Sequence, residues 1–251
     1  MDKVKTLILD IETTPLEGYF WRLFDENIGI NQIKEHGGVL SWAATWADSD
    51  FIEFSSVHHH GRDSMVATIW NLLDEADEVV GWNSNRFDIP HLNTEFLRAG
   101  WGPPSPYKKV DLFQTVKNTF KLPSNKLDYF AQQLGIGQKV EHEGFPLWVK
   151  CMEGDKEAWQ RMMEYNVHDV EITAEARLKL LPWITTGINR SAVADAHVCP
   201  NCGSTHLHSR GFTKTLSLRY QRFQCQDCGS WSRKVAAEEK SNRKERLVLA
   251  R

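Results

Sequence analysis

The sequence predicts an α/β domain with a mixed central sheet flanked by helices, followed by a small cysteine-containing module. Three observations predict this organisation. A run of branched apolar residues opens the chain and two further apolar stretches follow it. Amphipathic helical patterns then alternate with a short strand pattern. Near the C-terminus four cysteines stand in two close pairs. A chain of 251 residues can form one substantial core and one small module.

The composition is that of an ordinary soluble protein, with 41% hydrophobic and 25% charged residues. No apolar run approaches the ~20 residues that span a bilayer. The opening "MDKVK" lacks the apolar core of a signal peptide. We therefore expect a cytoplasmic protein, or one in the host cytoplasm if it is phage-encoded, with no membrane partner.

The charge is unevenly distributed along the chain. From Ala196 to Arg251 there are 11 Lys and Arg against 4 Asp and Glu, a net charge of +7, whereas the preceding residues carry −10. An acidic body with a basic C-terminal piece is expected of a nucleic-acid enzyme with a separate binding module. A solvated basic tail would give the same asymmetry.

The first strand carries two acids. The stretch "LILDIETTP" begins with apolar residues typical of a strand buried on both faces, and Pro15 signals its end. Asp10 and Glu12 lie two apart, so a strand directs both carboxylates to the same side. Unpaired charges beside a core are costly. Either the strand ends here and the acids are solvated, or they hold something positive.

The next elements follow from periodicity and turn residues. Residues 39–46 and 51–55 flank the polar turn "ADSD", which predicts a hairpin. Residues 64–77 have the apolar spacing of an amphipathic helix. "EVVGWNS" predicts a strand ending at Gly81. A further helix begins at Pro90 and is stopped by Gly100.

The second half is mainly helical in pattern. Residues 108–120 and 126–135 are expected to be helical or partly helical, and a long helix runs from Asp155 to about Leu181, with Asn166 as the candidate position of a break. The predicted domain bounds are 1–184 for the α/β domain, 185–197 for a linker, 198–233 for the cysteine module and 234–251 for a charged tail.

Further polar residues follow the later elements. Asp88 stands between a strand and a helix, where an N-cap is the alternative role. Tyr165 and Asp169 lie four apart on one helical face, where a surface pair is the alternative. Together with Asp10 and Glu12 they could converge at one sheet edge. Four such carboxylates would repel each other without cations, and they select hard divalent ions.

These segments resemble the exonuclease motifs of the DEDD superfamily, the DnaQ-like branch of the ribonuclease-H-like fold. "DIET" matches its Asp-x-Glu strand, and the third motif has the Tyr-x-x-x-Asp spacing of the tyrosine subgroup. The second is similar to a segment of family-B DNA polymerase proofreading domains, with matching residues Asn83, Phe87, Asp88 and Pro90.

The resemblance covers residues 5 to about 182. The helix "SNKLDYFAQQLG" also resembles those domains, and the motif aspartates lie 78 and then 81 residues apart. With its cysteine module, the chain is similar to a group of phage-encoded predicted exonucleases. The resemblance implies two Mg²⁺ or Mn²⁺ ions, with Asp10 bridging both and Glu12, Asp88 and Asp169 completing the ligands.

The resemblance also implies roles for neighbouring residues. Tyr165 would hydrogen-bond the attacking water, and Asn83 and Phe87 would contact the terminal nucleotides, Phe87 by stacking on a base. Core packing is the alternative for Phe87. Lys126 could contact a phosphate, with a solvated surface position as its alternative.

The cysteine module follows the pattern Cys-x2-Cys, 22 residues, Cys-x2-Cys, formed by Cys199, Cys202, Cys225 and Cys228. Such pairs bind one structural zinc ion as a zinc ribbon, and disulfides are the alternative. The intervening residues alternate like a β-hairpin in which basic and aromatic side chains are interleaved. Suited to backbone contact and base stacking are Arg219, Tyr220, Arg222 and Trp231. A protein-docking ribbon is the competing interpretation.

For two other features we expect no role in a metal or catalytic site. The tract His58–His60 is expected in a solvated loop, and Cys151 is expected to be a partly buried small residue.

The predicted function is a metal-dependent 3′-to-5′ exonuclease that hydrolyses phosphodiester bonds at nucleic-acid 3′ ends, preferentially of single-stranded DNA, and releases nucleoside 5′-monophosphates. It would act alone or beside a separate DNA polymerase or replication protein. The alternatives are a ribonuclease or structure-specific nuclease with the same acids, and a non-catalytic adaptor that binds nucleic acid or protein through the ribbon.

Overall fold

The computed structural model describes residues 4–137, 143–215 and 218–235. The chain divides into two compact units, Lys5–Arg177 and the described residues from Leu178 onward. The predicted bounds of domain, linker and ribbon stay predictions, and most of the expected tail lies outside the described residues. In the part of the chain that the structure describes, no helix is long and apolar enough to cross a membrane.

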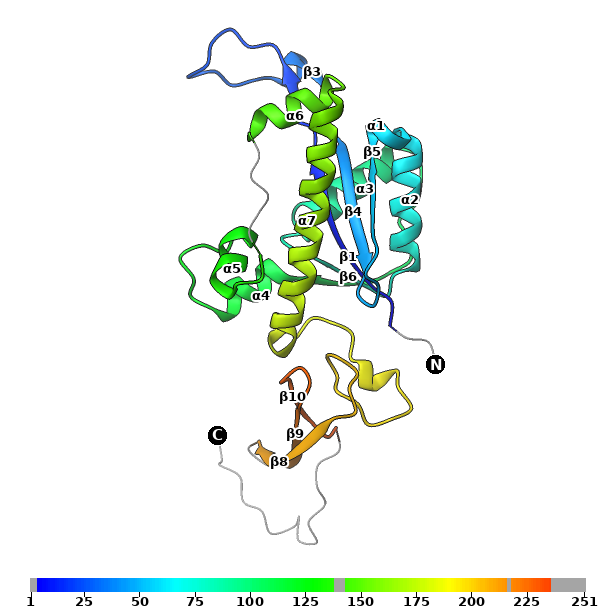
Figure 1. Ribbon diagram of the computed structural model, residues 1–251, viewed down its shortest axis with the longest axis vertical. Coiled ribbons are helices and arrows are strands. Elements are labelled where there is room, and N and C mark those ends of the chain that lie inside the picture. Colours follow the sequence, from blue (N-terminus) through cyan, green and yellow to red (C-terminus); the bar gives the residue numbers. More distant parts are fainter. Residues whose placement is uncertain (1–3, 138–142, 216–217, 236–251) are drawn as a thin grey trace, which may run out of the picture. The chain divides into compact units, whose positions relative to one another are not determined.

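The larger unit is built on a five-stranded mixed sheet with the order β5-β4-β1-β6-β7 (Figure 1). The central strand β1 (Thr6–Thr13) runs antiparallel to β4 (Val39–Trp46) and parallel to β6 (Glu78–Gly81). The edge strands are β5 (Ile52–Ser56), antiparallel to β4, and β7 (Lys108–Asp111), parallel to β6. The predicted mixed sheet and the 39–46 hairpin strand are confirmed.

Helices cover both faces of this sheet. On one face α2 (Arg62–Glu75) and α3 (Asp88–Arg98) enclose a core that includes Leu7, Leu9 and Ile11 of β1. On the other face α6 (Phe145–Met152) and α7 (Lys156–Leu180) pack with Leu40 of β4. Because neighbouring strand residues alternate in direction, Asp10 and Glu12 belong to the face that α7 covers.

The remaining elements of the larger unit are short. They are β2 (Glu17–Gly18), the 3₁₀ turn Ile30–Gln32, β3 (Ile33–Glu35), α1 (Val57–His60), α4 (Leu112–Thr119) and α5 (Leu127–Leu134). Strands β2 and β3 pair antiparallel with each other.

Four sequence expectations need correction. Lys108–Asp111 is a strand and not helical, because it pairs with β6 and buries Val110. The tract His58–His60 is exposed, as expected, but it lies in the helix α1 and not in a loop, and the ring of His58 stacks on that of Trp159 at a centroid distance of 5.1 Å. Helix α3 begins at Asp88, two residues before the expected Pro90. Helix α7 continues through Asn166 without a break.

The smaller unit contains a three-stranded antiparallel sheet in the order β10-β9-β8. The predicted hairpin is formed by β8 (Leu207–Lys214) and β9 (Arg219–Cys225), with residues 216–217 outside the described part. The third strand, β10 (Trp231–Arg233), was not predicted. Two 3₁₀ turns precede the sheet, Leu181–Trp183 and Arg190–Ala192.

Candidate metal centres

An acidic cluster forms where β1 meets α7. Ligand oxygens of Asp10, Glu12 and Asp169 all lie within 4.8 Å of one another. Asp169 is only 4% exposed and the other two are partly buried. Three carboxylates this close repel each other, and burial raises the cost of leaving their charge uncompensated. The donor set therefore fits a hard divalent cation, which prefers carboxylate oxygens.

Asp88 lies beside this cluster but outside the group of three. Its Oδ1 accepts a hydrogen bond of 3.1 Å from the backbone N–H of Ile11, the residue between Asp10 and Glu12. The carboxyl group is 2% exposed. It is the first residue of α3 and Phe87 is the N-cap, so the alternative of a capping aspartate is wrong.

Burial changes the acidity of Asp88. Desolvation is the largest of the causes that raise the pKa of Asp88 to about 7, and the charge of Asp111 acts in the same direction. The hydrogen bond from Ile11 opposes this shift because it favours the ionised form. A bound cation would favour that ionised form as well.

Asp111 is a buried residue that the sequence analysis missed. It ends β7, and its carboxylate accepts hydrogen bonds from the backbone N–H groups of Asn83 and Asn85 at 3.1 and 3.3 Å. It also caps α4 through Gln114. Asn83 has a φ of 64°, a left-handed conformation that is unfavourable for most residues other than glycine. The two bonds to Asp111 stabilise the turn between β6 and α3 in this conformation. Correct prediction of β7 would have placed Asp111 at the same sheet edge as the other acids.

Asn166 is the second residue that sequence reasoning missed. Its side chain is fully buried, and its Nδ2 donates a 2.8 Å hydrogen bond to Oδ2 of Asp10. Its Oδ1 accepts a 3.0 Å hydrogen bond from the hydroxyl of Ser41 on β4. The sequence indicated it only as a weak helix former.

Tyr165 lies one helical turn before Asp169 on α7. Its ring is 7% exposed and packs in the cluster that contains Leu40 and Trp159. The Trp148 ring meets it edge-on at a centroid distance of 6.1 Å. Because Tyr165 and Asp169 are both buried, the alternative of a surface pair is wrong.

The two predicted nucleotide contacts from β6–α3 differ in exposure. Asn83 is half-buried in the turn, whereas Phe87 is 38% exposed and its ring lies 4.5 Å from that of His91, centroid to centroid. Phe87 is therefore not a core residue. Lys126 is exposed and directly precedes α5.

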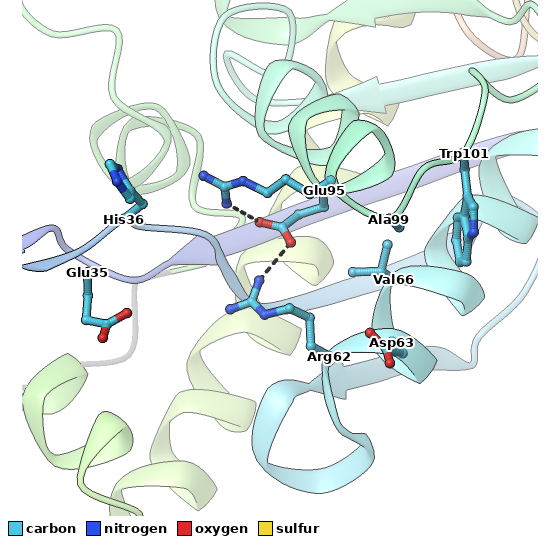
Figure 2. A pocket seen from close by; sticks show the side chains of 9 residues that line it. Glu35, His36, Arg62, Asp63, Val66, Glu95, Ala99 and Trp101 are labelled. Carbon is cyan, nitrogen blue, oxygen red and sulfur yellow. Dashed lines mark hydrogen bonds and ion pairs between the residues drawn. The ribbon is translucent and has the colours of Figure 1, made fainter.

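Two cavities lie near β3 and share Arg62 in their walls. One, of about 710 Å³, has at its base the buried Glu95, whose carboxylate pairs with Arg62 at 2.7 Å and with Arg98 at 3.1 Å (Figure 2). None of the predicted site residues lines it. The other, of about 400 Å³, has Thr14 and Pro15 in its wall, and none of the predicted site residues lines it either.

The four cysteines of the smaller unit also meet. All four Sγ atoms lie within 4.8 Å of one another, and the pairs Cys199–Cys228 and Cys202–Cys225 are 3.6 Å apart. No disulfide joins them. Zn–S bonds of about 2.3 Å in a tetrahedron place sulfurs about 3.8 Å apart. The cluster therefore fits one zinc ion.

The acidity of these thiols differs within the cluster. Burial raises the pKa values of Cys199 and Cys202. Burial is the largest single cause and opposes ionisation of Cys225, but hydrogen bonds from the backbone N–H groups of Cys228 and Asp227 and from the thiols of Cys202 and Cys228 together bring the pKa of Cys225 down to about 7. This thiolate is the most readily available to a metal ion.

The ribbon sheet carries two arginine–aromatic stacks. The guanidinium of Arg222 lies 4.9 Å from the ring centroid of Trp231, and that of Arg233 lies 4.1 Å from Tyr220. Trp231 is 54% exposed. A third contact joins Arg219 to Phe212 at 4.0 Å. Of the four nucleic-acid contacts predicted in the ribbon, Arg222, Trp231 and Tyr220 lie in the first two stacks, and Arg219 forms the third contact. Arg233 was not predicted.

Comparison with known proteins bears on the larger unit. No match was found among curated proteins. Among 160 matching chains of solved structures is the family B DNA polymerase from the hyperthermophilic archaeon Pyrobaculum calidifontis, with a TM-score of 0.55 and 20% sequence identity. The likeness covers 72% of this chain and 25% of the polymerase, so this chain spans about a quarter of that protein, and the likeness concerns the fold alone.

A family model described as the RNase_H superfamily matches residues 7–180. This range includes every strand of the larger sheet except the first residue of β1, together with all three members of the acidic cluster. It confirms the ribonuclease-H-like fold that the motifs predicted. Because the matched range is more than half of the sequence, the chain belongs to the RNase_H superfamily.

Proposed function

We propose that the protein is a metal-dependent 3′-to-5′ exonuclease of the DEDD type, tyrosine subgroup, that acts preferentially on single-stranded DNA. The observation that carries the proposal is the meeting of Asp10, Glu12 and Asp169 within 4.8 Å. Asp169 is far from Asp10 and Glu12 in sequence, yet the three gather on one face of a ribonuclease-H-like sheet. A purely structural role would not favour three neighbouring carboxylates.

The acids would hold two Mg²⁺ or Mn²⁺ ions. Asp10 would contribute to both, and Glu12, Asp169 and Asp88 would complete the ligands. Bound ions would lower the pKa of an attacking water and offset charge on the leaving oxygen. Asp88 is held against β1 by its bond to the backbone N–H of Ile11, between Asp10 and Glu12.

Other residues would position the substrate. Tyr165, immobilised by its packed ring, would hydrogen-bond the attacking water and orient it. Asn83 and the exposed ring of Phe87 would contact the terminal nucleotides, and Lys126 a phosphate.

The four-cysteine cluster would hold one structural zinc ion, and the ribbon would bind the nucleic acid. Stacked arginine–aromatic pairs can contact phosphates and unpaired bases at once, which suits a single strand. The net charge of +7 from Ala196 onward adds a general attraction to the backbone. Such an enzyme could work beside a separate DNA polymerase or replication protein.

The experiment that tests the proposal follows 5′-labelled single-stranded DNA, duplex DNA and RNA in Mg²⁺ or Mn²⁺. We expect a ladder that shortens from the 3′ end, fastest with single-stranded DNA. Asp10→Asn should lower the rate about a thousandfold, because loss of a metal ligand forfeits several kcal/mol of transition-state stabilisation.

Glu175→Gln is the matched control, since this acid is exposed on α7, outside the cluster. It should cleave like the unaltered protein. Internal cuts, or a preference for RNA, would contradict the proposal and favour a structure-specific nuclease or a ribonuclease that uses the same acids. Retention of DNA without any cleavage would replace it with an adaptor role.

A further inference from the structure

Asp10 is joined to α7 and β4 by a buried chain of hydrogen bonds. Ser41 donates to Oδ1 of Asn166 at 3.0 Å, and Nδ2 of Asn166 donates to Oδ2 of Asp10 at 2.8 Å. The same Nδ2 lies 3.3 Å from the backbone oxygen of Asp10. Ser41 and Asn166 are fully buried, so water does not compete for the bond between them, whereas the two bonds from Asn166 to the half-buried Asp10 are only partly shielded.

Chemistry fixes the direction of this chain. Both atoms of Asp10 that face Asn166 are acceptors, so the amide must present its nitrogen to them and its oxygen to Ser41. The serine hydroxyl, which can donate, satisfies that oxygen. Ser41 also lies opposite Glu12 in the β1–β4 register, so the chain is anchored within the same strand pair that carries the acids.

An amide suits this position better than a cation. A lysine or arginine would neutralise Asp10 and compete with a metal ion for it. The neutral amide orients the carboxylate but leaves its negative charge in place. An ionised carboxylate offers about four lone-pair sites, of which this bond takes one.

The position of Asn166 on α7 has a second consequence. Asp169 follows it within one turn, so the contact with Asp10 fixes α7 at the point where that helix delivers its own carboxylate. Side chains that hydrogen-bond metal ligands typically affect metal affinity by 10–100-fold.

We propose that Asn166, supported by Ser41, is a positioning residue that holds Asp10 in its metal-binding orientation before an ion arrives. The inference rests on the proposed function, because it requires the acidic cluster to be a metal site. Asn166 itself touches neither substrate nor ion.

The test is calorimetric titration of Mn²⁺ into the full, zinc-loaded chain. Asn166→Ala should weaken Mn²⁺ binding about tenfold or more, and Ser41→Ala by a few-fold. The double variant should bind no worse than Asn166→Ala, because Ser41 acts only through the amide. In cleavage assays, the Mn²⁺ concentration for half-maximal rate should rise while the rate at saturating Mn²⁺ stays within a few-fold.

Thr173→Val is the matched control. Thr173 is buried on the same helix, and its hydroxyl has no hydrogen-bond partner among the described residues. This variant should bind Mn²⁺ like the unaltered protein. If Asn166→Ala does not fold, Ser41→Ala decides the question.

Two results would overturn the inference. One is a folded Asn166→Ala, or in its absence Ser41→Ala, with unchanged Mn²⁺ affinity. The other is equal weakening by Thr173→Val. Failure of the proposed function is distinguishable, since the unaltered protein would then bind no divalent ion at the acids or cleave no strand.

Discussion

The two candidate metal centres are built in opposite ways. The cysteine cluster is local: two Cys-x2-Cys pairs within the smaller unit supply four ligands and leave no place for a substrate. The acidic cluster joins Asp10 and Glu12 of β1 to Asp169 of α7, more than 150 residues later in the sequence, and needs the whole sheet to form. The comparison teaches that one centre should hold a fold together, whereas the other should depend on a fold that exists without it.

Removal of zinc should give the largest effect. Cys225→Ser breaks the four-sulfur set, and structural zinc sites contribute on the order of 10 kcal/mol to small modules. We expect the ribbon to unfold and become sensitive to protease while the α/β unit stays folded. Binding to long single strands should weaken, and hydrolysis of a short one should persist. Equal loss on both substrates would contradict separate roles for the two centres.

Loss of an acid should have the converse outcome. Asp169→Asn should lower cleavage about a thousandfold for want of a metal ligand, yet leave the thermal unfolding temperature equal or higher, because one repelling charge is gone. Activity assays and a melting curve measure the two effects, with Glu175→Gln as control. A variant that unfolds would show that the acidic cluster is structural, like the cysteine cluster.

Asp88 should make stability depend on pH in the absence of divalent ions. Its pKa is about 7 in the folded protein and 3.8 ordinarily, so the folded state holds the proton more tightly. The contribution of Asp88 to the free energy of unfolding is therefore largest at low pH, and it declines as the pH rises to about 7. Relative to the unaltered protein, Asp88→Asn should gain on the order of 2 kcal/mol between pH 5 and pH 8.

Urea unfolding of the zinc-loaded protein at the two pH values, in buffer freed of Mg²⁺ and Mn²⁺ without a chelator, measures this difference. The asparagine can still accept the bond from Ile11, and Glu175→Gln controls for loss of an acid outside the cluster. A difference that does not change with pH would mean that Asp88 titrates normally in the folded state. Once zinc is bound, the cysteine ligands of the ribbon should not make the free energy of unfolding depend on pH over the same range.

The smallest effect is expected at the ribbon surface. Trp231→Ala should weaken binding of long single-stranded DNA by about 1–3 kcal/mol, the usual contribution of one base stack. Phe51→Ala, an exposed aromatic residue on the larger unit, is the control and should bind normally. Fluorescence anisotropy at fixed salt measures both. Unchanged binding by Trp231→Ala would favour a protein-docking ribbon.

The sequence predicted most of what depends on local pattern. The alternation around Asp10 and Glu12 predicted that their carboxylates share one side, and the spacing of the cysteine pairs predicted the four-thiol set. Asp169 was added by the resemblance to the DEDD motifs, and Asp88, expected as a fourth ligand, lies outside the group of three. The prediction was wrong at Lys108–Asp111, where pairing with β6 outweighs the helical pattern of the residues that follow. It was also wrong at Asn166, because its amide bonds to Asp10 and Ser41 and does not compete with the helix backbone.

What could not be predicted depends on contacts distant in sequence. The contacts of Asn166 could be predicted only if it were known that β1, β4 and α7 meet at one point. The hydrogen bond from Asn83 to Asp111 could be predicted only if it were known that β6 and β7 are neighbours in the sheet. The pKa of Asp88 follows from its burial against β1, which no local pattern reveals.

The most direct measurement is an anomalous difference map from crystals of the zinc-loaded protein soaked in Mn²⁺. We predict two manganese peaks about 3.5–4 Å apart, with Asp10 between them and with Glu12 and Asp169 as further ligands. A fully occupied ribbon zinc together with no manganese at these oxygens, or manganese only elsewhere on the molecule, would contradict the account.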